Sequence, residues 1–77
     1  MRTVVITGMA SGLRLEMAKV FRENNLNVVI SDLEEEKLKL AKEELMKIES
    51  NGKIKYFVCD VTNSRDISKL IKSTKKL

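Results

Sequence analysis

Several residue types that build common functional sites are scarce or missing in this chain. Its 77 residues include no His, no Pro, no Trp and a single cysteine, Cys59. Without histidine, one thiol cannot complete an ordinary zinc ligand set, and a lone cysteine cannot form an internal disulfide. We therefore expect no metal site and a reducing compartment, the cytoplasm. At the end of an apolar run, Cys59 is interpreted as a small buried apolar residue.

Long apolar runs are missing as well. The run of residues 3–7 is too short for a signal peptide, and nothing in the sequence approaches the roughly 20 apolar residues of a membrane span. We therefore expect no membrane partner. Apolar residues make up 43% and charged residues 34% of the chain, which is typical of an ordered globular protein. A chain of this length predicts one domain, residues 1–77, of marginal stability.

Acidic residues are few in the last third of the chain. The net charge is +4, and residues 53–77 carry seven Lys or Arg against two Asp or Glu. The basic end, residues 72–76, has two interpretations: a solvated helix end, favoured by the helix dipole, or a surface for nucleic acid. Two Phe and one Tyr are too few to alternate with the basic residues as base-stacking platforms. We favour the solvated helix end and expect no nucleic-acid partner.

What the sequence does contain is a regular alternation of two patterns. Apolar runs without polar alternation predict buried strands at 3–7, 27–31 and 54–59. Apolar residues at helical spacing predict helices from 12 to about 24, from 32 to about 50, and from about 64 onward. The first strand should be covered on both faces. The residues predicted to face inward are Leu13, Met17, Ala18 and Phe21, then Leu38, Ala41, Leu45 and Ile48, then Ile67, Leu70 and Ile71.

This alternation predicts an α/β fold of the order β-α-β-α-β-α. Short connections favour parallel strands joined by right-handed crossovers, so we expect half of a doubly wound Rossmann fold with strand order 3-2-1. Both crossovers step in the same direction, which puts the first two helices on one face of the sheet and the third on the other. The outer edge of the first strand then has no partner, and self-association through that edge is an expected interaction.

Two features suggest a nucleotide site at the ends of the first two strands. Glycines at Gly8 and Gly12 would let the backbone turn sharply and approach a phosphate at the start of a helix, although a tight strand-to-helix connection explains them equally well. Asp32 ends the second strand twenty residues after Gly12, where a carboxylate can accept hydrogen bonds from an adenosine ribose. Its alternative role is the N-cap of the next helix. A carboxylate there would repel a 2′-phosphate, which favours NAD over NADP.

The run from Thr7 to Leu13, with its two glycines and Ser11, resembles the cofactor loop TGxxxGxG of the short-chain dehydrogenase/reductase family. Residues 59–62, Cys-Asp-Val-Thr, are similar to the family's Asp-Val element after the third strand. The resemblance runs over essentially the whole chain and about the first third of a typical member. It implies a Rossmann fold and an NAD cofactor. The cofactor-binding residues that it implies are Gly8, Ser11, Gly12, Leu13, Asp32, Leu33, Asp60 and Val61.

The sequence departs from the family pattern in two ways. Arg14 stands where the third glycine belongs; its side chain would crowd the neighbouring strand or the cofactor, or swing out to pair with a phosphate. The family's catalytic Ser and Tyr-x-x-x-Lys pair have no counterpart, because the only tyrosine, Tyr56, is followed four residues later by Asp60. We therefore expect no catalytic residue within these 77 residues.

The resemblance implies that the chain is the NAD-binding portion of an oxidoreductase that acts on alcohol or carbonyl groups. Cut off before the catalytic residues, it is expected to be inactive alone. The alternative is a scaffold of the same fold that self-associates and, with Arg14 in its loop, binds no cofactor.

Overall fold

The protein is an alternation of strands and helices built on one parallel sheet. The computed structural model describes residues 2–8, 12–60 and 62–75. Within these residues the elements are β1 (Thr3–Thr7), α1 (Gly12–Glu23), β2 (Asn27–Asp32), α2 (Glu35–Met46), β3 (Ile54–Val58) and α3 (Ser64–Lys75). The sheet has the order β1-β2-β3 with both pairings parallel, which confirms the predicted topology.

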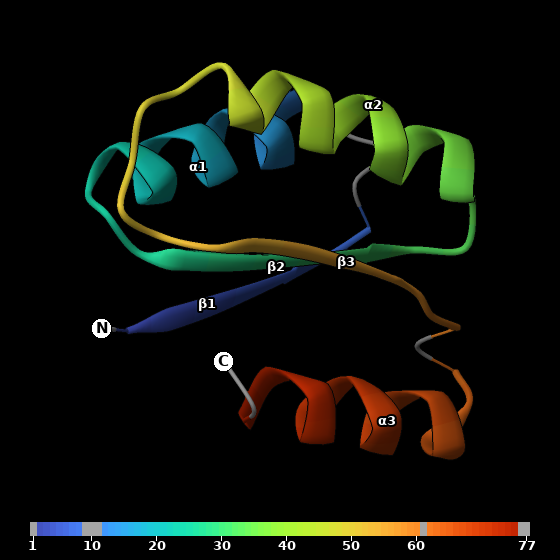
Figure 1. Ribbon diagram of the computed structural model, residues 1–77. Coiled ribbons are helices and arrows are strands. Elements are labelled where there is room, and N and C mark those ends of the chain that lie inside the picture. The colour runs from blue at the N-terminus through green and yellow to red at the C-terminus, as the bar shows by residue number, and fades with distance from the viewer. Residues whose placement is uncertain (1, 9–11, 61, 76–77) are drawn as a thin grey trace.

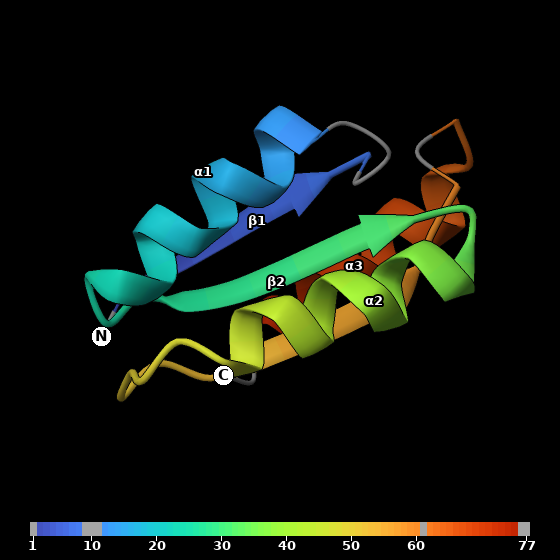
Figure 2. The ribbon, with the colours of Figure 1, turned by 90° about the horizontal axis from the view of Figure 1, so that it is seen from above.

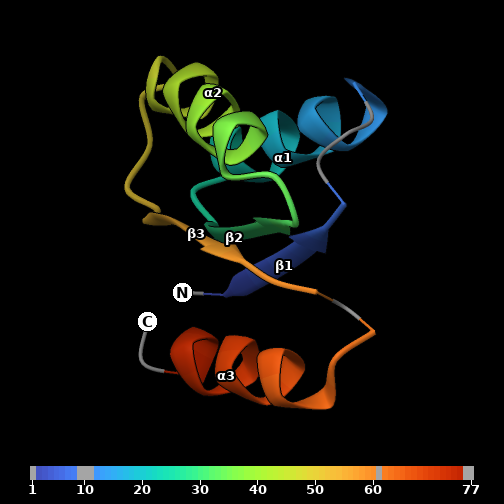
Figure 3. The same ribbon diagram turned by 90° about the vertical axis from the view of Figure 1, so that its right-hand side faces the viewer.

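The helices lie on opposite faces of the sheet. Figure 1 shows α1 and α2 above the strands and α3 below them. Figure 2 shows α1 over the β1 side of the sheet and α2 over the β3 side, and the side view of Figure 3 shows the sheet between the two helical layers. This arrangement follows from handedness: two right-handed crossovers that step in the same direction place their helices on the same face.

Apolar side chains fill the space on each face of the sheet. The upper core consists of residues from β1, β2, α1 and α2: Ile6, Ala18, Val28, Ile30, Leu38, Ala41 and Leu45. The lower core is smaller and joins the sheet to α3 through Val29, Cys59 and Leu70, with Phe57 packed against it. Because side chains alternate along a strand, β2 contributes to both cores.

The prediction that both faces of β1 are covered is wrong. Val5 is 41% exposed, whereas Ile6 beside it is buried. The reason is position: β1 is the edge of the sheet, and α3 packs below β2 and β3, at Val29 and Phe57. The upper side of β1 is therefore covered by α1, and its lower side faces solvent in part.

Some of the predicted inward residues are exposed. On α1, Ala18 is fully buried, but Leu13 is 71% and Met17 44% exposed. On α3, Leu70 is buried while Ile71 is 51% exposed. Among the described residues no element covers the outer sides of α1 and α3, so apolar residues beside the stripe that rests on the sheet remain exposed.

The predicted stop of α1 at Asn24 and Asn25 is confirmed. Asn25 has a φ of 61°, the left-handed conformation that asparagine tolerates at a helix C-terminus. Its side-chain oxygen accepts hydrogen bonds from the Ser50 hydroxyl at 3.4 Å and from the Asn51 N–H at 3.0 Å. The same residue thus ends α1 and holds the loop that precedes β3.

A buried arginine joins α1 to α2 and to the loop after it. Arg22 is 9% exposed. Its Nε donates to the Leu45 carbonyl at 2.8 Å, and its Nη1 donates to the Gly52 carbonyl at 2.6 Å. A cation is favourable at the C-terminal turn of a helix, where the carbonyls lack partners.

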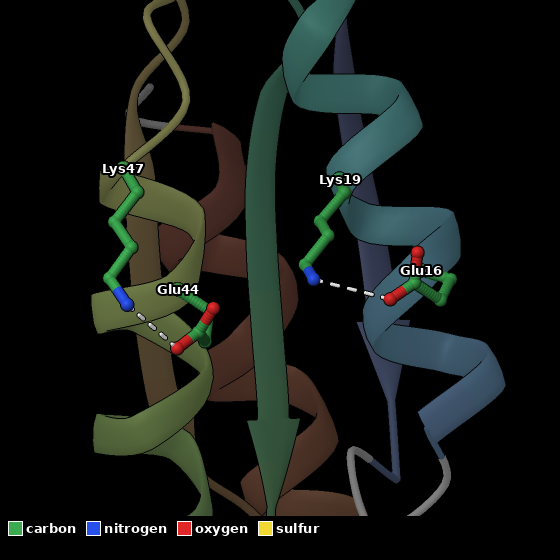
Figure 4. A network of polar contacts seen from close by, with 4 residues as sticks. All are labelled: Glu16, Lys19, Glu44 and Lys47. Carbon is green, nitrogen blue, oxygen red and sulfur yellow. Dashed lines mark hydrogen bonds and ion pairs between the residues drawn. The ribbon is translucent and has the colours of Figure 1, made fainter.

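Ion pairs lie on the surfaces of α1 and α2. Figure 4 shows Lys19 paired with Glu16 on α1 at 3.2 Å and Lys47 paired with Glu44 at the end of α2 at 3.0 Å. The hydrogen bond from Lys47 lowers the pKa of Glu44, and the charge of Lys19 adds to this effect. Such exposed pairs contribute little to stability.

The close packing around Gly52 leads to a prediction about stability. A Cβ at this position would lie 2.1 Å from the Leu26 carbonyl oxygen, which is backbone and cannot move aside. We expect Gly52→Ala to lower the free energy of unfolding by roughly 1–3 kcal/mol, the usual cost of overpacking, measured by urea denaturation followed by circular dichroism. The matched control is Gly12→Ala, because nothing lies within 4 Å of a Cβ there. Equal losses in the two variants would contradict the prediction.

Candidate functional site

The carboxyl ends of the strands form one rim of the sheet. In the parallel register Thr7 pairs with Ser31 and Asp32 pairs with Val58, so the strands end side by side. The segments that follow them therefore start at the same rim, which Figure 2 shows on the side toward which the strand arrows point. The structure thus brings Gly8, Asp32 and Asp60 together, as the sequence predicts. Ser11 and Val61 lie outside the described residues.

The turn after β1 begins at Gly8, which has a φ of 72°. Residues with a Cβ rarely adopt this conformation, so glycine is needed here. The Gly8 N–H donates to the Ser31 carbonyl at 2.8 Å, which fastens the start of the turn to β2. Gly12 is the first residue of α1, and Leu13 follows it with an exposed side chain. The first turn of α1 contains no acidic residue among those described.

The Arg14 side chain folds back toward the end of β1. Its Nη1 donates a hydrogen bond to the Thr7 carbonyl, the last of β1. Its guanidinium lies beside Gly8: the Cζ and Nη1 atoms are 3.8 Å, and Nε 3.9 Å, from where a Cβ of Gly8 would be. Of the orientations that the sequence leaves open, the structure has the side chain folded back against Thr7 and Gly8.

Asp32 is the last residue of β2 and is half-buried. One carboxylate oxygen, Oδ1, accepts the Glu34 N–H at 3.0 Å. Among the described residues, Oδ2 has no hydrogen bond. The alternative role as N-cap is wrong: α2 begins at Glu35 rather than at residue 32, and its N-cap is Glu34. Asp32 and the exposed Leu33 instead form the connection from β2 to α2 at the rim.

Asp60 follows β3 and is held by its neighbours. Its Oδ1 accepts hydrogen bonds from the Thr62 hydroxyl at 2.6 Å and from the Thr62 N–H at 2.9 Å. The hydroxyl contributes most to lowering the pKa of Asp60, followed by the N–H. The Asp60 N–H donates to the Asp66 carboxylate on α3 at 3.0 Å. The bonds from Thr62 have a recognisable signal in the sequence, an Asp two residues before a Thr, whereas the contact of Asp66 has none.

Cys59 faces the lower core beside this rim and is buried. Burial raises the pKa of its thiol, and the nearby charges of Asp66 and Asp60 raise it further. It is therefore a neutral thiol at neutral pH and packs as a small apolar group, as the sequence suggests. No cluster of His, Cys, Asp and Glu suited to a metal ion occurs in residues 2–8, 12–60 and 62–75. In the same part of the chain, no helix is long and apolar enough to cross a membrane.

The rim combines opposite kinds of chemistry. A glycine turn at the start of α1, with the guanidinium of Arg14, supplies N–H donors and positive charge. The carboxylates of Asp32 and Asp60 supply acceptors farther along the rim. Such a surface suits a ligand that has an anionic group at one end and hydroxyl or amino donors at the other.

Comparison with known proteins gives a consistent result. The family model for short chain dehydrogenases matches residues 2–77. The curated protein short chain dehydrogenase helC of Aspergillus fumigatus is 35% identical over 74 residues, which cover 96% of this chain and 29% of that protein. This chain therefore spans less than a third of the length of that relative.

Two solved structures have the same fold. NAD⁺-bound xylitol dehydrogenase superposes with a TM-score of 0.83 and 21% identity, over 94% of this chain and 27% of that one. A metagenomic short-chain oxidoreductase in complex with NADP superposes with a TM-score of 0.82 and 21% identity, over 94% of this chain and 32% of that one.

The bonds around Asp60 generate a pH prediction. Because its pKa in the folded chain is lowered from 3.8, its ionised form stabilises the fold above about pH 4, and this stabilisation is lost as the pH falls through the lowered pKa. We expect Thr62→Val, which removes the hydroxyl donor, to raise the pKa of Asp60 toward its ordinary value in a carboxyl-carbon NMR titration.

The matched control for this titration is Thr74→Val on α3, whose hydroxyl donates to the Leu70 carbonyl at 2.8 Å and does not contact Asp60. An unchanged pKa of Asp60 in Thr62→Val would show that the hydroxyl does not stabilise the carboxylate.

Proposed function

The chain belongs to the short-chain dehydrogenase family, and from this premise we propose that residues 1–77 are the NAD-binding portion of an oxidoreductase. The observation that carries the proposal is the shared rim, where the turn at Gly8, the carboxylate of Asp32 and the segment at Asp60 meet. In this proposal NAD supplies hydride transfer to or from an alcohol or carbonyl carbon, and this chain supplies binding and orientation.

The turn between β1 and α1 is proposed to receive the pyrophosphate. Its features fit that group: Gly8 has a positive φ and no Cβ, so the backbone can come close to a ligand. The N–H groups at the start of α1 point outward along the helix axis, where the dipole favours an anion. Ser11, Gly12 and Leu13 complete the proposed pyrophosphate segment.

The adenosine part is proposed to lie along the carboxylates. The Oδ1 atom of Asp32 accepts a hydrogen bond from the Glu34 N–H, which fixes the carboxylate. Its Oδ2 atom is left to accept hydrogen bonds from ribose hydroxyls. Leu33, Asp60 and Val61 are proposed to line the adenine. The hydrogen bonds from Thr62 hold Asp60 in its turn and favour its ionised form.

The negative charge of Asp32 favours NAD over NADP. The NADP cofactor carries a phosphate on the 2′-oxygen of the same ribose, and two negative groups at hydrogen-bonding distance repel each other. The neighbours in structure include an NAD⁺-bound and an NADP-bound enzyme. We therefore base the choice of NAD over NADP on Asp32 alone.

These 77 residues are proposed to lack catalytic activity by themselves. Hydride transfer to a carbonyl requires a general acid, and Tyr56 does not suit this role. It lies in β3 against the upper core, and the Lys42 ammonium of α2 stands 5.7 Å from the centre of its ring. The ring is therefore packed between β3 and α2. The catalytic groups of the oxidoreductase are therefore proposed to come from outside residues 1–77.

A cytoplasmic location stays a prediction from the single cysteine.

Substitution of Asp32 tests the proposed binding of NAD. We expect calorimetric titration to detect NAD binding by the wild-type chain. The variant Asp32→Asn keeps Oδ1 as the acceptor for the Glu34 N–H, and we expect it to bind NAD more weakly and NADP more tightly. The ratio of the two affinities should shift by roughly tenfold, the effect of one charge-assisted hydrogen bond. Glu36→Gln, an exposed carboxylate in the first turn of α2, is the control. A folded chain that gives no heat with millimolar NAD would refute the proposed function.

A second function, self-association as a scaffold, is favoured by β1. Among the described residues β1 pairs with β2 alone, so its other edge is open. The Arg2 carbonyl and the Gly8 N–H bond to β2, and by alternation along the strand the N–H and C=O of Val5 point to the open edge. With a side chain 41% exposed, Val5 stands at the centre of an edge that suits strand pairing between copies.

The test of this second function is the mass of the chain in solution. If β1 edges pair, sedimentation should give a dimer, and Val5→Lys should restore the monomer because a lysine on an edge strand opposes pairing. The control Val20→Lys places the same charge on an exposed position of α1. A wild-type chain that stays monomeric at every concentration would exclude the scaffold function.

A further inference from the structure

The cations of α3 differ from those of the other two helices in having no partner. Every Lys and Arg of α1 and α2 is paired with an acidic side chain, is bonded to a backbone carbonyl or, for Lys42, lies over the Tyr56 ring. Within the part of the chain that the structure describes, four exposed cations of α3 form no ion pair and no side-chain hydrogen bond: Arg65, Lys69, Lys72 and Lys75. Unpaired positive charge is therefore concentrated on the layer below the sheet.

These four residues, called here the basic face, lie on one side of α3. At about 3.6 residues per turn they fall within about 120° of the helix surface and extend over roughly 15 Å. Leu70 lies on the opposite side and packs in the lower core. The one acidic residue of α3, Asp66, accepts the Asp60 N–H and is not paired with a cation. Figure 3 shows α3 as a separate layer with the sheet on one side of it.

The helix dipole explains only half of the basic face. Lys72 and Lys75 lie in the last turn of α3, where the dipole favours a cation. Arg65 is the second residue of the helix, at the end where the dipole favours an anion, so the same effect opposes it. Lys55 adds an exposed cation from another element, because alternation along β3 puts it on the same side of the sheet as Phe57 of the lower core. The positive charge thus extends beyond one helix end.

The arrangement of the basic face indicates the shape of its partner. A helix in a groove of DNA contacts phosphates on both walls and reads base edges with side chains between them. On α3 the flanks of the basic face are occupied by Ser73 and Ile71, and the helix contains no Asn or Gln. It also has no aromatic residue on which single-stranded bases could stack. A one-sided row of cations instead fits a flat anionic surface, with the 51% exposed Ile71 placed to enter the edge of a bilayer.

We propose that the basic face of α3 attaches the chain reversibly to the anionic surface of a phospholipid membrane. The sequence predicts no membrane partner because nothing in it approaches a membrane span, whereas this attachment concerns the membrane surface alone. Each cation near such a surface strengthens binding roughly fivefold, and salt screens the attraction. The attachment is independent of the proposed nucleotide site, because the basic face contains none of the residues assigned to that site.

Co-sedimentation with vesicles tests this attachment. At low ionic strength we expect the wild-type chain to pellet with vesicles of equal parts phosphatidylserine and phosphatidylcholine, and not with vesicles of phosphatidylcholine alone. The double variant Lys69→Gln with Lys72→Gln should bind roughly twenty-five-fold more weakly, because two cations are lost. The matched control, Lys37→Gln with Lys39→Gln, removes the same charge from α2, where both lysines are paired with glutamates. We expect the control to keep the wild-type affinity within about twofold, since its lysines lie on the other face of the sheet.

Three results would overturn the proposal. The first is a wild-type chain that does not pellet with the phosphatidylserine vesicles at low ionic strength. The second is an equal loss of binding in the two double variants, which would assign the effect to net charge rather than to the basic face. The third is a duplex DNA that binds the chain more tightly than the vesicles do at equal phosphate concentration. If circular dichroism shows that the first double variant is unfolded, Arg65→Gln with Lys75→Gln replaces it, with the same expected loss.

Discussion

The structure depends on the complete burial of β2. Residues Asn27 to Ser31 are all buried, and the strand pairs in parallel with β1 on one side and β3 on the other. A strand with neighbours at both edges and helices on both faces has no polar side, so a continuous apolar run is its natural sequence. The registers on its two edges decide where β1 and β3 end. The position of Gly8, Asp32 and Asp60 on one rim is therefore a consequence of how β2 is packed.

The two ends of the sheet differ in how their polar groups are used. At the amino end, side chains bond to the backbone of distant segments: Arg22 to the Leu45 and Gly52 carbonyls, and Asn27 to the Lys53 N–H at 2.8 Å. At the carboxyl end, the carboxylates of Asp32 and Asp60 bond to residues two positions away. The first kind of bond joins distant segments of the fold, and the second shapes a turn within one connection. At the carboxyl rim the contacts between elements come instead from other groups, such as the Asp66 carboxylate on α3, which accepts the Asp60 N–H.

Most of the fold could be predicted from the sequence, because local patterns determine it. Apolar runs gave the strands, and the handedness of crossovers gave the side on which each helix lies. Exposure could not be predicted at Leu13 or Val5, because it depends on which elements stand beside each residue in space. Arg22 gave no signal either: a charged residue within an apolar helical pattern looks like a surface residue, and its partners, Leu45 on α2 and Gly52 in the loop after it, are 23 and 30 positions away. In the site, the residue types were foreseeable, but the rotamer of Arg14 and the partner of Asp32 were not.

The start of the turn after β1 has a conformational cost of its own. Gly8 holds a left-handed conformation at the end of β1, and glycine lowers stability because the unfolded chain has more freedom to lose. The bond from the Arg14 side chain to the Thr7 carbonyl fastens the first turn of α1 to the end of β1. The residue that stands in place of the family's third glycine therefore offsets part of the conformational cost of the first one.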